Sequence, residues 1–69
     1  MSSQSIPMLV KQARHQDSWT QAELAERAGV SRPTVARLEA GQDVSVRSLT
    51  AVLSALGLEL HVQVRDHQD

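Results

Sequence analysis

Two arginines, Arg32 and Arg37, are the side chains of this sequence whose type and spacing best suit recognition chemistry. A guanidinium group offers two parallel donors, which match the O6 and N7 acceptors of a guanine base. A helix that buries Val35 and Leu38 turns both arginines to its opposite face, beside two small apolar side chains that suit contact with a thymine methyl group. The candidate base-reading residues on this face are Arg32, Pro33, Ala36 and Arg37.

Contacts to phosphate are expected from the starts of helices, where free backbone amides and the helix dipole favour an anion. Gln21 opens one predicted helix and is the first candidate, and Thr34 in the first turn of the next helix is the second. Arg47 adds a charged candidate at the start of a later helix. Thr20 and Ser31 precede two of these helices, so we expect their hydroxyl groups to act as helix caps instead.

The three histidines do not indicate an active site or a metal centre. His15, His61 and His67 have no nucleophile or carboxylate at a catalytic spacing, and short helices offer no sizeable cleft. His61 falls on the polar face of a predicted strand and His15 near a helix end, which are ordinary solvated positions. We expect no enzymatic activity, no metal and no cofactor.

Length and composition limit the chain to one small domain. It has 69 residues, of which 41% are hydrophobic and 22% charged, a size near the lower limit for an independent hydrophobic core. The absence of cysteine excludes disulfides and thiolate metal sites and is compatible with a reducing compartment. Neither a secretory signal nor an apolar run of about 20 residues, the length of a membrane span, is present, so we expect a soluble cytoplasmic protein.

The net charge of −1 argues on its own against a nucleic-acid partner, because neutralising phosphates supplies much of the affinity for DNA. The distribution of charge along the chain is more favourable to DNA binding than the net charge. Residues 1–47 carry six cations and five acids, whereas residues 48–69 carry one cation and three acids. The N-terminal part is therefore slightly electropositive, although charge alone favours an ordinary solvated surface over a DNA-binding one.

Helix start and stop signals divide most of the chain into four predicted helices. Each follows a serine or threonine that can cap it, and Thr20 with Glu23 forms the pattern of a capping box. The second and third helices, joined by a tight turn at Gly29, form a helix-turn-helix pattern, in which the second of the pair enters the major groove. The predicted helices span residues 6–16, Gln21 to Gly29, 32–40 and 46–56.

After Gly57 the apolar residues change from helical spacing to an alternation of two, which is typical of a half-buried strand. Because no other segment offers a strand partner, we infer that residues 58–65 pair with a second copy of the chain or with another protein. A frayed tail is the alternative. The apolar positions of this predicted strand are Leu58, Leu60, Val62 and Val64.

Three stretches make the sequence resemble the lambda and Cro type repressors, also called the xenobiotic-response-element family. They are Trp19-Thr20-Gln21-Ala22-Glu23-Leu24-Ala25, Gly29-Val30-Ser31 and Leu38-Glu39-Ala40-Gly41. The resemblance covers residues 6–57 and implies a compact bundle of four or five helices, with residues 20–40 docking on operator DNA. The strand that follows is similar to that of HipB-like antitoxins, whose C-terminal strands pair across a dimer and which bind a kinase-fold toxin.

The resemblance also implies roles for three further residues. Arg14 and Glu39 match positions that pair in several relatives, and we interpret this pair as structural. Gln42 matches a loop position whose backbone amide contacts phosphate in the family.

We therefore expect an all-α helix-turn-helix domain over residues 1–57, a dimerisation strand over 58–65 and a tail over 66–69. The expected function is a homodimeric DNA-binding repressor, the antitoxin and autorepressor of a HipBA-like operon with a HipA-like kinase toxin as partner. Two alternatives stay open: a free-standing repressor without a toxin, and an interaction module that neutralises a partner protein without binding DNA.

Overall fold

The computed structural model describes residues 5–61, and this part of the chain is all-helical, as predicted. Each helix lies within one or two residues of its predicted bounds. None of the helices in the described part is long and apolar enough to cross a membrane. The helices are α1 (Ile6–Gln16), α2 (Gln21–Ala28), α3 (Arg32–Glu39) and α4 (Val46–Ala55).

All four helices begin at a hydroxyl side chain that accepts a hydrogen bond from a backbone amide three residues later. The caps are Ser5, Thr20, Ser31 and Ser45. At α2 the capping box is complete, because the Glu23 carboxylate also accepts a hydrogen bond from the Thr20 amide at 2.8 Å. Each cap satisfies a donor that a helix start otherwise leaves unpaired, which fixes where the helix begins.

All four helices also end in the same way, with a residue at positive φ followed by an amide that bonds back five residues. At α2 the residue is Gly29, with φ of 72°, and the Val30 amide donates to the Ala25 carbonyl at 3.0 Å. At α1 the residue is Ser18, with φ of 58°, and the Trp19 amide donates to the Arg14 carbonyl at 3.1 Å. These are Schellman-type ends, which turn the chain sharply toward the next helix.

The core is built from small and branched aliphatic side chains contributed by all four helices. It contains no aromatic residue, although Trp19 packs against its edge. Its buried members are Val10, Leu24, Ala25, Val35, Leu38, Val52 and Leu53.

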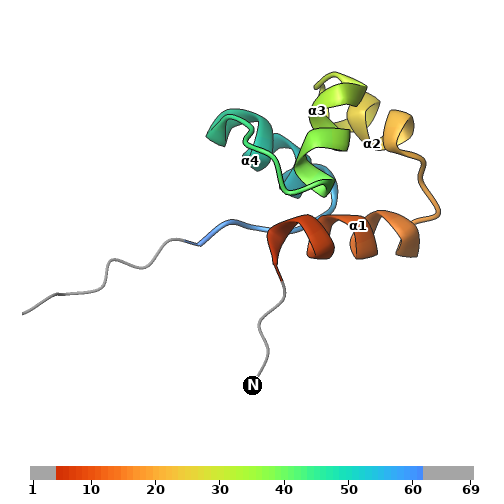
Figure 1. Ribbon diagram of the computed structural model, residues 1–69. Helices are drawn as coiled ribbons and strands as arrows, with labels where there is room; N and C mark the ends of the chain where they lie inside the picture. The colour runs from red at the N-terminus through yellow and green to blue at the C-terminus, as the bar shows by residue number, and fades with distance from the viewer. Residues whose placement is uncertain (1–4, 62–69) are drawn as a thin grey trace, which may run out of the picture.

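Helix α3 occupies the middle of the molecule and contacts each of the other three helices. Figure 1 shows α2 and α3 together at the top, α4 beside α3, and α1 lying beneath them. Because α3 is short and surrounded on one side by α1, α2 and α4, only its remaining side can meet a partner.

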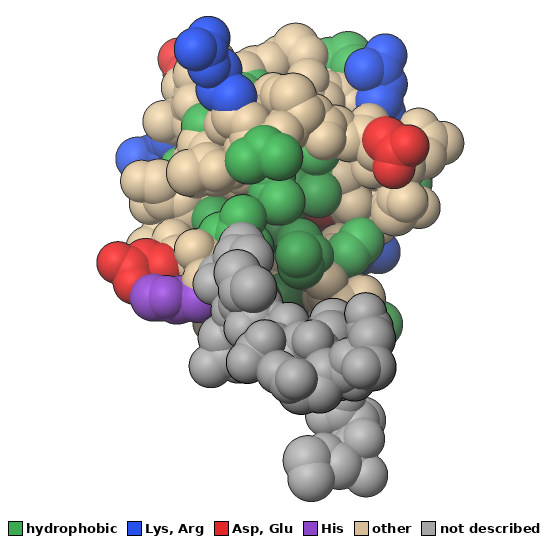
Figure 2. Space-filling model, turned by 90° about the vertical axis from the view of Figure 1, so that its left-hand side faces the viewer, with side chains coloured by type: hydrophobic (Ala, Val, Ile, Leu, Met, Phe, Trp, Pro, Cys, Tyr) green, Lys and Arg blue, Asp and Glu red, His purple; other side chains and the backbone are tan. Residues whose placement is uncertain are grey.

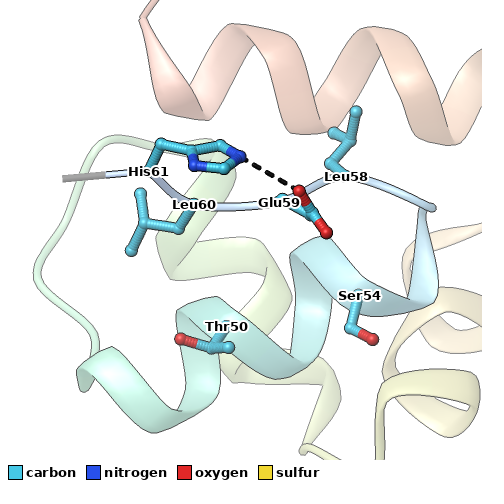
Figure 3. A pocket seen from close by; sticks show the side chains of 6 residues that line it. All are labelled: Thr50, Ser54, Leu58, Glu59, Leu60 and His61. Atoms are coloured by element: carbon cyan, nitrogen blue, oxygen red, sulfur yellow. Dashed lines mark hydrogen bonds and ion pairs between the residues drawn. The ribbon is translucent and has the colours of Figure 1, made fainter.

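The C-terminal segment departs from the prediction in the part that the structure describes. Residues 58–61 belong to no helix or strand, and Val62 and Val64 lie outside the described residues. Leu58 packs against the core, whereas Leu60 is 38% exposed. Figure 3 shows Leu58 pointing toward α1 and Leu60 turning away from it, with the Glu59 and His61 side chains joined at 3.0 Å.

Candidate nucleic-acid interface

The turn between α2 and α3 holds the two helices in a fixed relation through local contacts. Gly29 adopts the left-handed conformation that ends α2, and only Val30 and Ser31 separate it from α3. Ala25, which is 3% exposed, and the half-buried Val30 both belong to the packed interior around this turn. The geometry is that of a helix-turn-helix unit, whose second helix is presented to the outside.

The outer face of α3 carries the base-reading candidates. Val35 and Leu38 are 0% and 4% exposed and anchor the inner face, while Arg32, Pro33 and Arg37 are exposed on the other side. Neither guanidinium group makes a hydrogen bond or ion pair to any described residue. Both guanidinium groups therefore keep all their donors for a ligand.

Ala36, the fourth candidate on this face, is half-buried. Its methyl group sits between the exposed and the buried sides of α3, so it presents less surface than Pro33. Of the two apolar candidates, Pro33 is the better placed for contact with a thymine methyl group.

The first turn of α3 uses its hydroxyl groups internally. Ser31 Oγ accepts a hydrogen bond from the Thr34 amide at 3.3 Å and lies 2.8 Å from Thr34 Oγ1. Thr34 was expected to contact phosphate, but its hydroxyl and its amide both take part in the cap of α3. A phosphate contact from Thr34 would have to share these atoms.

The loop after α3 changes the expectation for Gln42. Its backbone amide donates to the Arg37 carbonyl at 2.9 Å as part of the helix end, so the amide that the family resemblance assigned to phosphate is already engaged. The side chain of Gln42 is exposed, as is that of Arg47 in the first turn of α4. Arg47 stays a phosphate candidate, and at Gln42 the exposed side chain is a candidate in place of the engaged amide.

A polar junction joins α1, the start of α2 and the end of α3. We define it by Arg14, Gln21, Glu39 and the carbonyl of Trp19. Arg14 donates from Nε to Glu39 Oε2 at 2.6 Å and from Nη2 to Glu39 Oε1 at 2.9 Å, and its Nη1 donates to the Trp19 carbonyl at 2.8 Å. The ionic side chains are only 9% and 4% exposed, and Gln21 Nε2 donates to Glu39 Oε1 at 3.2 Å.

The junction perturbs both of its charged groups. Burial by itself raises the pKa of Glu39, but the hydrogen bonds from Arg14 and Gln21 and the positive charges of Arg14 and Lys11 outweigh burial, so that the pKa is lowered overall. The pKa of Arg14 is raised, first by its hydrogen bond to Glu39, against an opposing effect of burial. Both groups are therefore held in their charged forms.

Sequence reasoning missed two features of this region. The bond from Gln21 to Glu39 joins residues 18 apart in the chain, and no local pattern signals it. The Arg27 guanidinium lies 4.4 Å from the centre of the Trp19 ring, a cation–π contact between α2 and the preceding turn. A cation eight residues after a lone tryptophan is too weak a signal to have predicted that contact.

Two further properties of the described residues concern metal binding and pockets. They hold no group of three His, Asp or Glu side chains that could bind a metal ion. One shallow pocket lies between α4 and the C-terminal segment (Figure 3), lined by Thr50, Ser54, Leu58, Glu59, Leu60 and His61. A second lies between the start of α1 and the end of α3, where Met8, Lys11 and Gly41 are among its lining residues.

Comparison with known proteins identifies the family of this chain and a similar solved structure. Residues 10–62 match the helix-turn-helix family, a stretch that includes α2, α3, α4 and most of α1. A chain of the solved HipA–HipB–O2–O3 complex is similar to this one, with a TM-score of 0.72 and 26% sequence identity, over 96% of this chain and 99% of that chain. No curated protein sequence matches.

Proposed function

The chain belongs to the helix-turn-helix family, and on that basis we propose that it is a sequence-specific DNA-binding repressor that inserts α3 into the major groove. The observation that carries the proposal is the outer face of α3, where Arg32 and Arg37 are exposed and their guanidinium groups make no hydrogen bond or ion pair with described residues. A DNA duplex offers the acceptors that these two guanidinium groups lack, in the form of guanine edges.

Exposed arginines are common on protein surfaces, so the support for DNA binding comes from where Arg32 and Arg37 lie. Arg14, which has a structural role, forms two hydrogen bonds to Glu39. Arg32 and Arg37 have no such use, and they stand on the helix that this family presents to the major groove. The assignment of Arg32, Pro33 and Arg37 to bases, and of the Gln42 and Arg47 side chains to phosphates, is part of the proposal.

The test is binding of the purified protein to DNA upstream of its own gene across a salt series, beside a scrambled duplex. We expect tight, salt-sensitive binding to the upstream DNA and a loss of sequence preference in Arg37→Ala. Arg27→Ala is the matched control, because it removes the same charge from α2, where the guanidinium stacks on Trp19. Binding to the upstream DNA no tighter than to the scrambled duplex would contradict the proposal and favour a protein-neutralising module.

We further infer that the protein is the antitoxin and autorepressor of a HipBA-like operon and binds a HipA-like kinase toxin. The similarity to a chain of the HipA–HipB–O2–O3 complex over nearly the whole length of both chains supports this inference. The test is purification of the tagged chain from its native host. A co-purifying kinase-fold protein encoded beside it is the expected result, whereas a chain that purifies alone would favour a free-standing repressor.

The repressor is proposed to act as a homodimer, with its two α3 helices in major grooves of a pseudo-palindromic operator, about 10 base pairs apart or a multiple of that. Figure 2 shows hydrophobic side chains gathered on the face of the molecule that carries residues 58–61. Large apolar side chains left exposed in the described residues include Val46 at 70% and Leu60 at 38%. Residues 58–65 are the segment proposed to pair across the dimer, with residues 1–57 as the DNA-binding domain.

A charge in this segment tests the dimer. Leu60→Asp or Val62→Asp should weaken both self-association, measured by sedimentation, and operator binding, because a dimer holds two half-sites together. His61→Asp introduces a similar charge at a side chain that is already 81% exposed and should have little effect. A Leu60→Asp protein that still dimerises would rule out pairing through this segment.

A further inference from the structure

We propose that Gln21 is a positioning residue, whose side-chain amide ties the first turn of α2 to the C-terminal end of α3 through Glu39. The inference rests on the proposed function, since it concerns how the same DNA-binding surface is held. The bond uses the side-chain amide of Gln21, so the phosphate contact expected from the backbone amides at this helix start is a separate proposal.

The geometry of the junction gives Gln21 a defined partner. Its Nε2 lies 3.2 Å from Glu39 Oε1, the oxygen that also accepts a hydrogen bond from Arg14 Nη2 at 2.9 Å. The other carboxylate oxygen, Oε2, accepts from Arg14 Nε at 2.6 Å. With its side chain only 4% exposed, Glu39 meets protein donors in place of water, so each of these bonds has little competition from solvent.

The bond spans the two helices whose relation decides how the protein can meet DNA. Gln21 is the first residue of α2, where backbone amides face outward and suit a phosphate. Glu39 is the last residue of α3, two residues after Arg37. A tie between these points fixes the base-reading side chains of α3 relative to the start of α2.

A positioning role and a phosphate-binding role for the Gln21 side chain predict different changes in DNA affinity when its side-chain amide is removed. A residue that only contacts phosphate contributes equally on every sequence, so its loss weakens all duplexes alike. A residue that orients α3 matters only where bases are read. Its loss lowers affinity for the operator and leaves affinity for a scrambled duplex unchanged.

Gln21→Met tests the proposal, because methionine keeps the side-chain length and the helix propensity of glutamine but has no donor. Gln16→Met, at an exposed position near the end of α1, is the matched control. We expect the ratio of operator to scrambled affinity to fall about fivefold in Gln21→Met, the typical value of one hydrogen bond, and to be unchanged in Gln16→Met.

A second measurement uses the free protein and needs no DNA. The carboxyl group of Glu39 is faced by Arg14 and Lys11 of α1 as well as by Gln21, so its titration can be followed by carbon NMR in each variant. Gln21→Met should raise the pKa of Glu39, because one of the bonds that lowers it is lost. Gln16→Met should leave that pKa unchanged.

An unchanged Glu39 pKa in Gln21→Met would overturn the proposed tie. Equal weakening on both duplexes would overturn the positioning role in favour of a phosphate ligand. If the wild-type chain bound neither duplex, the proposed function would fail, while the pKa measurement would still decide whether Gln21 holds Glu39.

Discussion

Two regions of this small molecule carry arginine side chains and use them in opposite ways. In the polar junction, all three nitrogens of the Arg14 guanidinium donate to Glu39 or to the Trp19 carbonyl, and the side chain is 9% exposed. On the outer face of α3, Arg32 and Arg37 are exposed, and their guanidinium groups make no hydrogen bond or ion pair with the described residues. The first region is chemically complete, whereas the second has donors without acceptors.

The difference teaches that the net charge of the chain says little about its partners. A total of −1 includes a buried pair that cancels inside the fold, and the cations available to a ligand are those left over on particular faces. For DNA binding by a surface of this size, unpaired guanidinium groups on one helix face matter more than the net charge of the chain. Each of the following changes removes or alters groups in one of the two regions.

The largest effect is expected from Glu39→Ala, which breaks the junction. Removing one partner of a buried ion pair leaves the other charge uncompensated, which typically costs about 3–5 kcal/mol of stability. Because small domains are stable by only about 5–15 kcal/mol, the midpoint of urea unfolding should fall sharply. Glu39→Gln keeps the side-chain size and one acceptor oxygen for the three donors that meet Glu39, so it should lose less than Glu39→Ala. Equal stability of Glu39→Ala and wild type would show that the junction is not structural.

The next largest effect is expected on DNA binding rather than on stability. Arg37→Ala should reduce discrimination between the operator and a mismatched duplex by about 1–3 kcal/mol, the value of one bidentate arginine–guanine contact. Its free energy of unfolding should change by no more than about 0.5 kcal/mol, because an exposed side chain without partners contributes little to the fold. A destabilised Arg37→Ala protein would contradict the contrast between the two regions.

Acid should weaken the junction selectively. The pKa of Glu39 is lowered in the folded chain, so its contribution to stability is complete above the unfolded value of about 4.3 and is lost as the pH falls through the folded pKa. Unfolding followed by circular dichroism should therefore show a stability that declines below about pH 4.3. In Glu39→Gln, which cannot titrate at this position, the decline should be shallower; an identical decline in both proteins would remove Glu39 as its cause.

The smallest effect on stability is expected from Ser18→Gly, which removes backbone strain in the turn between Arg14 and Trp19 of the junction. Ser18 adopts a φ of 58° directly before Trp19, whose carbonyl Arg14 binds. A non-glycine residue in this conformation is strained by about 1–2 kcal/mol. Glycine removes this strain, but part of the gain is lost because glycine gives the unfolded chain more conformational entropy. We expect a gain of about 0.5–1 kcal/mol by thermal unfolding, whereas Ser54→Gly, at an exposed position inside α4, should be destabilising.

Local patterns predicted the helices well, because the contacts that start and stop a helix join residues close in sequence. The cap at Thr20 and the turn at Gly29 could be identified from a few neighbouring residues. Ser18 was not identified as a helix end, since serine is rarely found at positive φ and the bond that holds it there comes from the Trp19 amide.

The candidate site was only partly predictable. The exposed face with Arg32 and Arg37 followed from the spacing of Val35 and Leu38, because one helix has only two sides. The engagement of the Gln42 amide by the Arg37 carbonyl depends on how the chain turns after α3, which a sequence motif does not specify.

The sequence by itself determined where the helices lie and which face of α3 is outward, since both follow from interactions within a few residues. It also indicated, through a family resemblance, that Arg14 and Glu39 pair. Only the tertiary structure decided that Gln21 joins them, because Gln21 and Glu39 are 18 residues apart and meet when α2 and α3 pack together. Long-range side-chain bonds depend on the packing of whole helices, and that packing is set by the core rather than by the polar residues that it brings together.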